Sequence, residues 1–387
     1  MATATVPVIP KAATDERLAG RSPLIRLMIR PEFGALTGAL VVFALFAWQG
    51  GDAWLSWQGT KTYVETAALL GVSALAVALL MIGGEFDLSS GVIVGTTGMF
   101  TALFSVHAGW PVQVAMLVSL VIAVAIGVLN GVMVVTSRLP SFIVTLGVLF
   151  ALQGFNLWLT RRVTDQTQVV GIESSDGFSL GRKLFASDFM HIGTVGFKVA
   201  IVWFAVMAVI GAWVLSRTKV GNWIFAVGGN KEAARMVGVP ATATKVGLFV
   251  TVAVCGWIHG QIVLFQTSRS NVLEGVGQEF FYIIAAVLGG CLLTGGFGSI
   301  VGAALGCLIL GMTQRGIPLA GWDNNLYFLF LGAILLIAAF ANEWIRRWAT
   351  SVSRPPSETI EQAAAEAEHD AEATAAMVEA DLAGGER

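Results

Sequence analysis

The pattern of hydrophobic and polar positions is dominated by long runs without Asp, Glu, Lys or Arg. A membrane-spanning helix needs about 20 mainly apolar residues, because a ~30 Å hydrocarbon core is crossed at about 1.5 Å per residue. The runs cover residues 33–51, 66–84, 88–137, 139–160, 199–216, 246–268, 280–314 and 324–342, with interruptions at 107–111 and 295–298. The pattern therefore predicts ten spans in an all-α, polytopic transmembrane helix bundle.

Composition supports a membrane protein and separates the two ends of the chain. Of 387 residues, 56% are hydrophobic and 12% are charged, about half the charged fraction typical of soluble domains. The net charge of −2 includes a tail, residues 355–387, that has nine acidic residues and one basic residue. We expect a basic N-terminal segment over 1–33, a transmembrane domain over 34–346 and an acidic, disordered tail over 347–387.

The distribution of basic residues predicts the orientation. If the N-terminus is cytoplasmic, 15 Lys and Arg residues fall on that side of the ten spans and 8 on the other. This excess agrees with the positive-inside rule. An even number of spans then places both termini, and the polar segment 228–240, in the cytoplasm.

No enzymatic motif is present in the sequence. It contains no Gly-Lys dipeptide and hence no phosphate-binding P-loop, so we expect ATP to be bound elsewhere and no cofactor in this chain. Cys255, Cys291 and Cys307 fall inside apolar runs without metal-ligand spacing, which predicts neither a disulfide framework nor a metal site. The chain is expected to be a non-enzyme, with no catalytic residue and no nucleic-acid partner.

The segment 228–240 is predicted to form a short capped helix. Asn230 can accept an amide hydrogen bond at the N-cap, and Glu232 lies in the first turn, where the helix dipole favours an anion. Gly238 suits the left-handed position that ends a helix, and Pro240 prevents continuation. A helix of about two turns does not persist alone in water, so it must pack against lipid, its own protein or a partner. Ala233, Ala234, Met236 and Val237 would give it an apolar face beside Lys231 and Arg235.

Four sequence elements resemble one transporter family. Residues 227–239 (VGGNKEAARMVGV) resemble the cytoplasmic coupling segment of ribose/xylose/galactose-type permeases of ABC importers. Residues 83–91 (GGEFDLSSG) are similar to that family's GGIDLSVG signature, 139–147 (LPSFIVTLG) to its PxFIxTLG element, and 288–299 (LGGCLLTGGFGS) to its late Gly-Gly turn. The chain departs from the family pattern at Glu85, Phe86 and Ser90, and in its acidic tail.

The resemblance implies a permease of the bacterial plasma membrane that transports a monosaccharide or polyol. A cytoplasmic ATPase would drive it, an extracytoplasmic binding protein would deliver the sugar, and a second permease copy would complete a homodimer. The coupling segment would contact the ATPase through Asn230, Lys231, Glu232, Ala233, Arg235 and Gly238. The alternative is an ion-coupled secondary transporter or channel, but the spans carry few of the ionisable residues that ion coupling needs.

Several polar residues near or inside the spans are candidates for the substrate pathway. Asn130, Gln153 and Asn156 could donate hydrogen bonds to sugar hydroxyls, or could bond neighbouring helices instead. Asp87 and Ser89 follow a Gly-Gly break, where Asp87 could equally cap the next helix. Glycines at helical spacing, such as Gly127/Gly131, are interpreted as packing faces. The polar segment 161–196 is either a plain loop or a set of short surface helices.

Overall fold

The computed structural model of the chain describes residues 31–351, with side chains for residues 32–340. Our predictions for residues 1–30 and 352–387, including most of the basic N-terminal segment and of the acidic tail, lie outside the described residues. Two units are separated at residue 340, and the description below concerns the first, up to Phe340.

The described part of the chain is built from helices with four short strands. The helices are α2 (Pro31–Leu55), α3 (Trp57–Ile82), α4 (Ser90–Val106), α5 (Val112–Ser137), α6 (Ser141–Thr164), the 3-10 turn η3 (Ile172–Ser174), α7 (Phe178–Phe185), α8 (Ala200–Arg217), α9 (Lys219–Gly229), α10 (Lys231–Met236), α11 (Ala241–Thr267), α12 (Gln278–Leu288), α13 (Ile300–Leu319) and α14 (Leu326–Ser351). The strands β1 (Gln168–Val170) and β4 (Arg269–Asn271) pair antiparallel, as do β2 (Asp188–Ile192) and β3 (Val195–Lys198).

Seven of the described helices are long and apolar enough to cross a membrane: α2, α3, α5, α6, α8, α11 and α13. Three further apolar helices are shorter, namely α4, α12 and the part of α14 up to Phe340. Both predicted interruptions are present, because α4 ends at Val106 before α5 begins at Val112, and a non-helical segment separates α12 from α13. A polytopic helical membrane protein is thus confirmed, while the number of ten spans stays a prediction.

One span begins earlier than the charge pattern indicated. Helix α3 starts at Trp57 rather than near residue 66, with Ser56 accepting a hydrogen bond from the Gly59 amide as its N-cap. Its first turns therefore carry charged residues, and the Glu65 carboxylate accepts a hydrogen bond from the Lys198 amide at 2.8 Å. A search for runs without charged residues leaves out Lys61 and Glu65. A membrane helix can nevertheless include a charged residue where a neighbouring group bonds it, as the Lys198 amide bonds Glu65.

Helix α11 packs against α3, α4 and α5. Its close contact with α5 depends on two glycines of α5. A Cβ atom on Gly127 would lie 2.8 Å from the Val250 Cα, and one on Gly131 would lie 2.7 Å from the Val246 Cα. Small residues four apart thus allow α5 and α11 to approach backbone to backbone, which confirms the predicted packing face.

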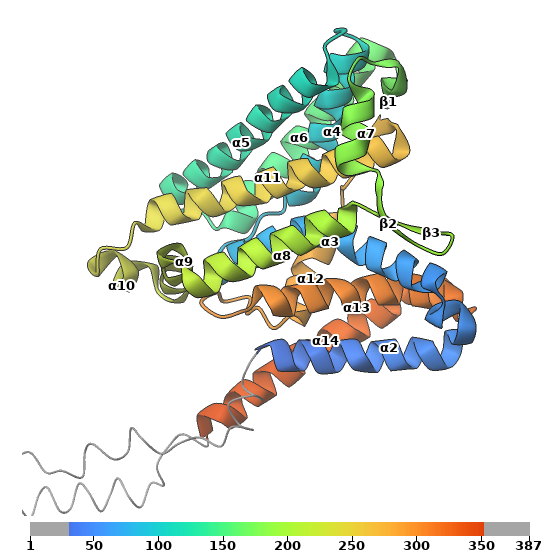
Figure 1. Cartoon of the computed structure of the whole chain (residues 1–387). Coiled ribbons are helices and arrows are strands. Elements are labelled where there is room, and N and C mark those ends of the chain that lie inside the picture. Colours follow the sequence, from blue (N-terminus) through green and yellow to red (C-terminus); the bar gives the residue numbers. More distant parts are fainter. Residues whose placement is uncertain (1–30, 352–387) are drawn as a thin grey trace, which may run out of the picture. The chain divides into compact units, whose positions relative to one another are not determined.

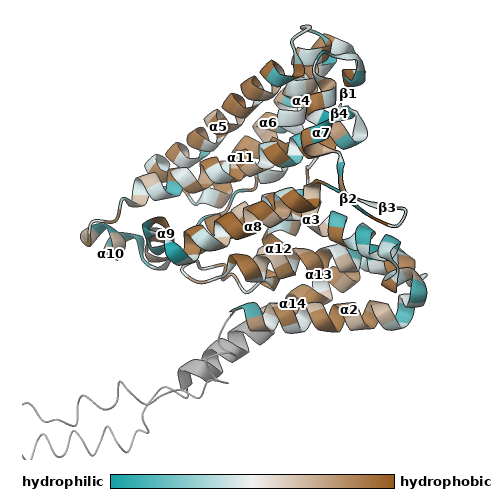
Figure 2. Cartoon of the chain, in the orientation of Figure 1, coloured by the Kyte–Doolittle hydropathy of each residue, from teal (hydrophilic) through white to brown (hydrophobic). Residues whose placement is uncertain are grey.

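The two ends of the long helices differ in character. Figure 1 shows α9 and α10 at one end, and α7 with strands β2 and β3 at the other. Apolar residues predominate along the helices between these ends, and hydrophilic residues are more frequent at the ends (Figure 2).

The segment 161–196 is an ordered layer rather than a plain loop. It includes β1, η3, α7 and β2, and α7 buries Phe178 and Phe185. Their rings lie 5.6 and 5.9 Å from the ring of Phe265 on α11. The interpretation as short surface helices is confirmed for η3 and α7, whereas the strands of this segment were not predicted. Contact with an external partner stays a prediction.

Candidate functional site

The predicted coupling segment folds as its sequence signals indicated. Helix α10 covers Lys231–Met236, and the Asn230 side chain accepts a hydrogen bond from the Ala233 amide at 3.0 Å. Gly238 has φ +83°, the left-handed conformation that terminates the helix. A short helix with its own N-cap and its own C-terminal glycine thus connects α9 to α11.

Only part of the predicted apolar face of α10 is available to a partner. Ala234 is buried at 4% exposure and packs with Val227 of α9 and Ala241 of α11. Met236 and Val237, by contrast, are 85% and 79% exposed. One side of the short helix is therefore anchored on its own protein, while the other presents large apolar side chains outward.

Charged groups surround this exposed face. Arg235 Nη1 lies 3.6 Å from Glu232 Oε1, in an ion pair whose side chains are 44% and 77% exposed. Partial burial, together with the nearby Lys245, lowers the pKa of Lys231 below its ordinary value. Glu85 and Glu232 act in the opposite direction, so this surface carries charges of both signs.

Two Gly-Gly turns and the Gly-Gly end of α9 meet beside the coupling segment, in a cluster that we call the glycine junction: Gly84, Gly228, Gly229, Gly295 and Gly296. The Gly296 amide donates to the Ile82 carbonyl at 2.8 Å. A Cβ on Gly295 would lie 2.6 Å from the Gly84 Cα, and one on Gly296 would lie 2.8 Å from the Gly229 Cα. The C-terminal end of α9 therefore touches both the turn before α4 and the turn before α13, backbone against backbone.

A buried ion pair adjoins the glycine junction. Lys245 of α11 pairs with Glu85, and the two side chains are 8% and 12% exposed. The turn that carries Glu85 is also bonded to α6, where Ser141 Oγ accepts from the Phe86 amide and Thr145 Oγ1 from the Leu88 amide, each at 3.0 Å. In the sequence Glu85 is notable only as a departure from the family pattern, and nothing there indicates its partner Lys245, which is 160 positions away.

Three of the predicted pathway residues form one buried network. Asp87 Oδ1 accepts from the Ser89 amide at 2.8 Å and from the Ser89 hydroxyl at 2.6 Å. Asn130 Nδ2 of α5 donates to the same hydroxyl at 2.7 Å. Asp87 thus holds Ser89, the N-cap residue of α4, but does not itself cap the helix, which has no side-chain cap hydrogen bond from the described residues. Its Oδ2 and the Asn130 Oδ1 are buried without a partner among the described residues.

The other two pathway candidates lie on α6 and are not joined to this network by a hydrogen bond between described residues. Asn156 is fully buried, and its Nδ2 donates to Thr96 Oγ1 of α4 at 2.8 Å. Its Oδ1 has no partner among the described residues. Gln153 is half-buried. In this structure both Asn130 and Asn156 bond neighbouring helices, and their contact with sugar stays a prediction.

Two buried polar features escaped the sequence analysis. Glu279 is 3% exposed, and its Oε2 accepts from the Gly277 amide at 2.9 Å beside Gly91 of α4. His259 Nδ1 lies 3.0 Å from Ser73 Oγ and 3.3 Å from the Tyr282 hydroxyl. An acidic residue in an apolar stretch was the available signal for Glu279, because such residues are rare inside membranes unless functional.

Comparison with known proteins identifies the family. Residues 60–339 match the family described as branched-chain amino acid transport system / permease component, and the chain belongs to this family. The chain is therefore a multi-pass membrane permease component. Permease components of ABC importers in general work with an ATPase and a substrate-binding partner.

Individual relatives are similar over most of their length. The chain is 25% identical to the xylose transport system permease protein of Escherichia coli (strain K12), over 81% of this chain and 92% of the relative. It is 28% identical to the fructose import permease protein of Rhizobium meliloti, over 73% and 77%. The ribose import permease protein of E. coli (strain K12) is also 28% identical, over 72% and 84%. No solved structure matches the chain significantly.

Proposed function

We propose that the chain forms the translocation pathway for a monosaccharide or related polyol in an ABC importer. A separate cytoplasmic ATPase binds ATP and drives the cycle, and an extracytoplasmic binding protein delivers the sugar. The relatives named for xylose, fructose and ribose support this substrate class. The family match also favours a driven permease over the ion-coupled carrier or channel.

Helix α10 carries the proposal for coupling. It is fixed to its own protein by Ala234, yet leaves Met236 and Val237 more than three-quarters exposed at the end of the long helices. Exposed apolar side chains grouped beside charged ones are typical of protein interfaces. A groove on the ATPase receives this surface, and the glycine junction transmits its displacement to the turns before α4 and α13.

The pathway proposal rests on Asn130, Gln153, Asn156, Asp87 and Ser89. Buried polar oxygens normally have hydrogen-bond partners. The partnerless Asp87 Oδ2, Asn130 Oδ1 and Asn156 Oδ1 are therefore acceptors to which sugar hydroxyls could donate. A second copy of the chain completes the importer as a homodimer.

The proposed topology has ten spans and both termini in the cytoplasm. Single cysteines introduced at Asp176 and at Lys231, in a background without Cys255, Cys291 and Cys307, should react with an impermeant reagent from opposite sides of the membrane. In intact cells only the cysteine at Asp176 should be labelled. Labelling of both positions would contradict this topology.

The coupling proposal is tested by Ala233→Arg. Ala233 is exposed, so the substitution leaves the packing of α10 on its own protein intact and places a bulky charge on the partner-facing side. Burial of an unpaired charge at an interface costs several kcal/mol (roughly 3–5), enough to dissociate a moderate complex. The variant should insert normally, lose sugar uptake and copurify less ATPase.

The matched control is Ala108→Arg, at an exposed alanine between α4 and α5. It adds the same side chain away from α10 and should retain both uptake and ATPase. Wild-type uptake and full ATPase recovery with Ala233→Arg would show that α10 is not the coupling element.

A further inference from the structure

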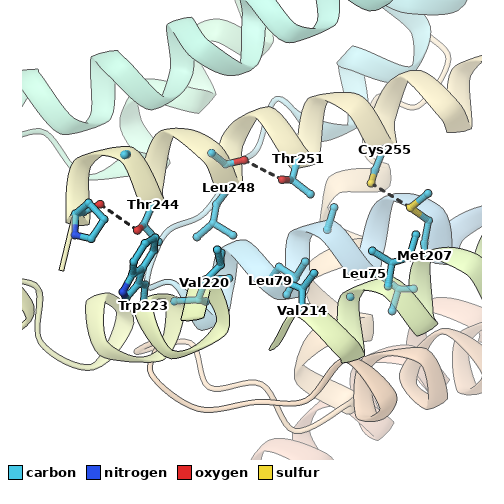
Figure 3. A pocket seen from close by; sticks show the side chains of 17 residues that line it. Leu75, Leu79, Met207, Val214, Val220, Trp223, Thr244, Leu248, Thr251 and Cys255 are labelled. Atoms are coloured by element: carbon cyan, nitrogen blue, oxygen red, sulfur yellow. Dashed lines mark hydrogen bonds between the residues drawn. The ribbon is translucent and has the colours of Figure 1, made fainter. Parts of the chain in front are cut away.

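An apolar cavity of about 430 Å³ lies between α3, α8, α9 and α11. Figure 3 shows side chains from these helices around it. Its lining includes Leu75, Met207, Val220, Trp223, Leu248 and Cys255. The cavity is separate from the network of Asp87, Ser89 and Asn130, none of which lines it.

Three of the polar side chains in the lining have contacts of their own, and the remaining polar group is the indole N–H of Trp223. The Thr244 hydroxyl donates to the Pro240 carbonyl at 3.0 Å, and the Thr251 hydroxyl donates to the Gly247 carbonyl at 2.8 Å. The Cys255 thiol lies 4.0 Å from the Met207 sulfur. Since a sugar or a water molecule needs several polar partners and this lining offers few, the cavity favours a hydrocarbon occupant.

The length of the cavity matches one leaflet of a bilayer. Along α11 its lining extends from Ala243 to Cys255, twelve residue steps or about 18 Å at ~1.5 Å per residue. Half of a ~30 Å hydrocarbon core is about 15 Å. A lipid acyl chain from the leaflet on the α9 side would therefore fill the cavity from its entrance to the bilayer centre.

Two free cations stand at the α9 end of the cavity. Arg217 ends α8 and Lys219 begins α9; both are exposed, and neither side chain has an ion pair or hydrogen bond with another described residue. Lys219 precedes Trp223 by one helical turn, so it lies on the same face of α9 as this lining residue. These charges complement the phosphate of an anionic lipid, and each basic residue near a membrane surface attracts such lipids.

We infer that the chain binds one anionic phospholipid, with an acyl chain in the cavity between α3, α8, α9 and α11 and the head group at Arg217 and Lys219. Because α9 precedes α10 and α11 follows it, the lipid supports both attachments of the coupling helix. The site goes beyond sugar transport and depends only on the chain being in a membrane.

Gly247→Phe tests the acyl-chain part of the site. Gly247 lines the cavity, and a Cβ built on it would have no atom within 4 Å, so a phenyl ring can occupy the space without displacing protein. Gly147→Phe is the matched control, since Gly147 is an exposed glycine of α6 whose added Cβ would also meet nothing within 4 Å. Native mass spectrometry of delipidated protein, titrated with phosphatidylglycerol or phosphatidylcholine of identical acyl chains, measures the binding.

Wild type and Gly147→Phe should retain one phosphatidylglycerol per chain, and Gly247→Phe should lose it. The double variant Arg217→Gln/Lys219→Gln changes only exposed side chains and should fold. It should weaken phosphatidylglycerol binding by about 25-fold, or ~5-fold for each charge removed, without changing phosphatidylcholine binding. Three results would overturn the inference. The two Phe variants could retain phosphatidylglycerol equally, or wild type could bind the two lipids equally. In the third, Gly247→Phe alone would lose a permease dimer. The last result would mean that a second copy covers the cavity.

Discussion

Loss of Lys245 should destabilise the protein far more than loss of an exposed lysine or arginine. Lys245→Gln removes the cation that faces Glu85 and leaves the carboxylate buried, since the side chains are only 8% and 12% exposed. Breaking a buried pair by removing one partner typically costs about 3–5 kcal/mol. The variant should therefore unfold several degrees below wild type.

The exposed pair of α10 provides a matched control. Arg235 and Glu232 are 44% and 77% exposed at 3.6 Å, and such a surface pair is worth about 0–1 kcal/mol. Arg235→Gln should therefore leave the unfolding temperature close to that of wild type.

The assay is thermal unfolding of the purified protein in one detergent. The scan rate is kept fixed, because the midpoint of an irreversible unfolding transition depends on it. The double variant Glu85→Gln/Lys245→Gln removes both charges and should recover most of the stability lost in Lys245→Gln. A midpoint for Lys245→Gln within a degree of that of Arg235→Gln would refute the reasoning.

Two further predictions concern the glycine junction and the pathway. Gly228→Ala should abolish uptake and lower stability, because its Cβ would collide with the Ile82 carbonyl. Gly229→Ala should be tolerated, because its Cβ would meet no atom within 4 Å. Equal uptake by the two variants would contradict the role proposed for the glycine junction. Asn156→Leu should lower sugar uptake while leaving ATPase copurification intact. If the Asn156 amide acts only through its hydrogen bond to Thr96, then Thr96→Val should reduce uptake as much as Asn156→Leu does. Normal uptake by Asn156→Leu would show that Asn156 only packs between helices.

The sequence predicted the local structure well because its signals were local. The interruption at 107–111 and the capping of α10 by Asn230 each depend on residues within one or two turns, and both are present. Charge-free windows identified the apolar helices but misplaced the start of α3, whose first turns carry Lys61 and Glu65. A charged residue with a partner can be part of a span.

The arrangement of the site could not be predicted, because it depends on contacts between distant positions. The Gly-Gly pairs at residues 83–84 and 295–296 were each matched to a family element, yet nothing in the sequence indicated that both touch Gly228. Lys245 and Glu85 are separated by 160 positions. Ala234 was expected on the apolar face of α10, but the sequence did not indicate that this residue is buried against α9 and α11 while Met236 and Val237 are exposed.

Reconstitution of uptake tests most directly the claim that this chain is a permease driven by a separate ATPase. Proteoliposomes would contain the chain with its ATPase, and radiolabelled xylose, ribose or fructose would be presented with the binding protein. Accumulation of one of these sugars should require ATP, the ATPase and the binding protein together, and should vanish when any of them is omitted. Accumulation by the chain alone, under an ion gradient and without ATP, would contradict the claim.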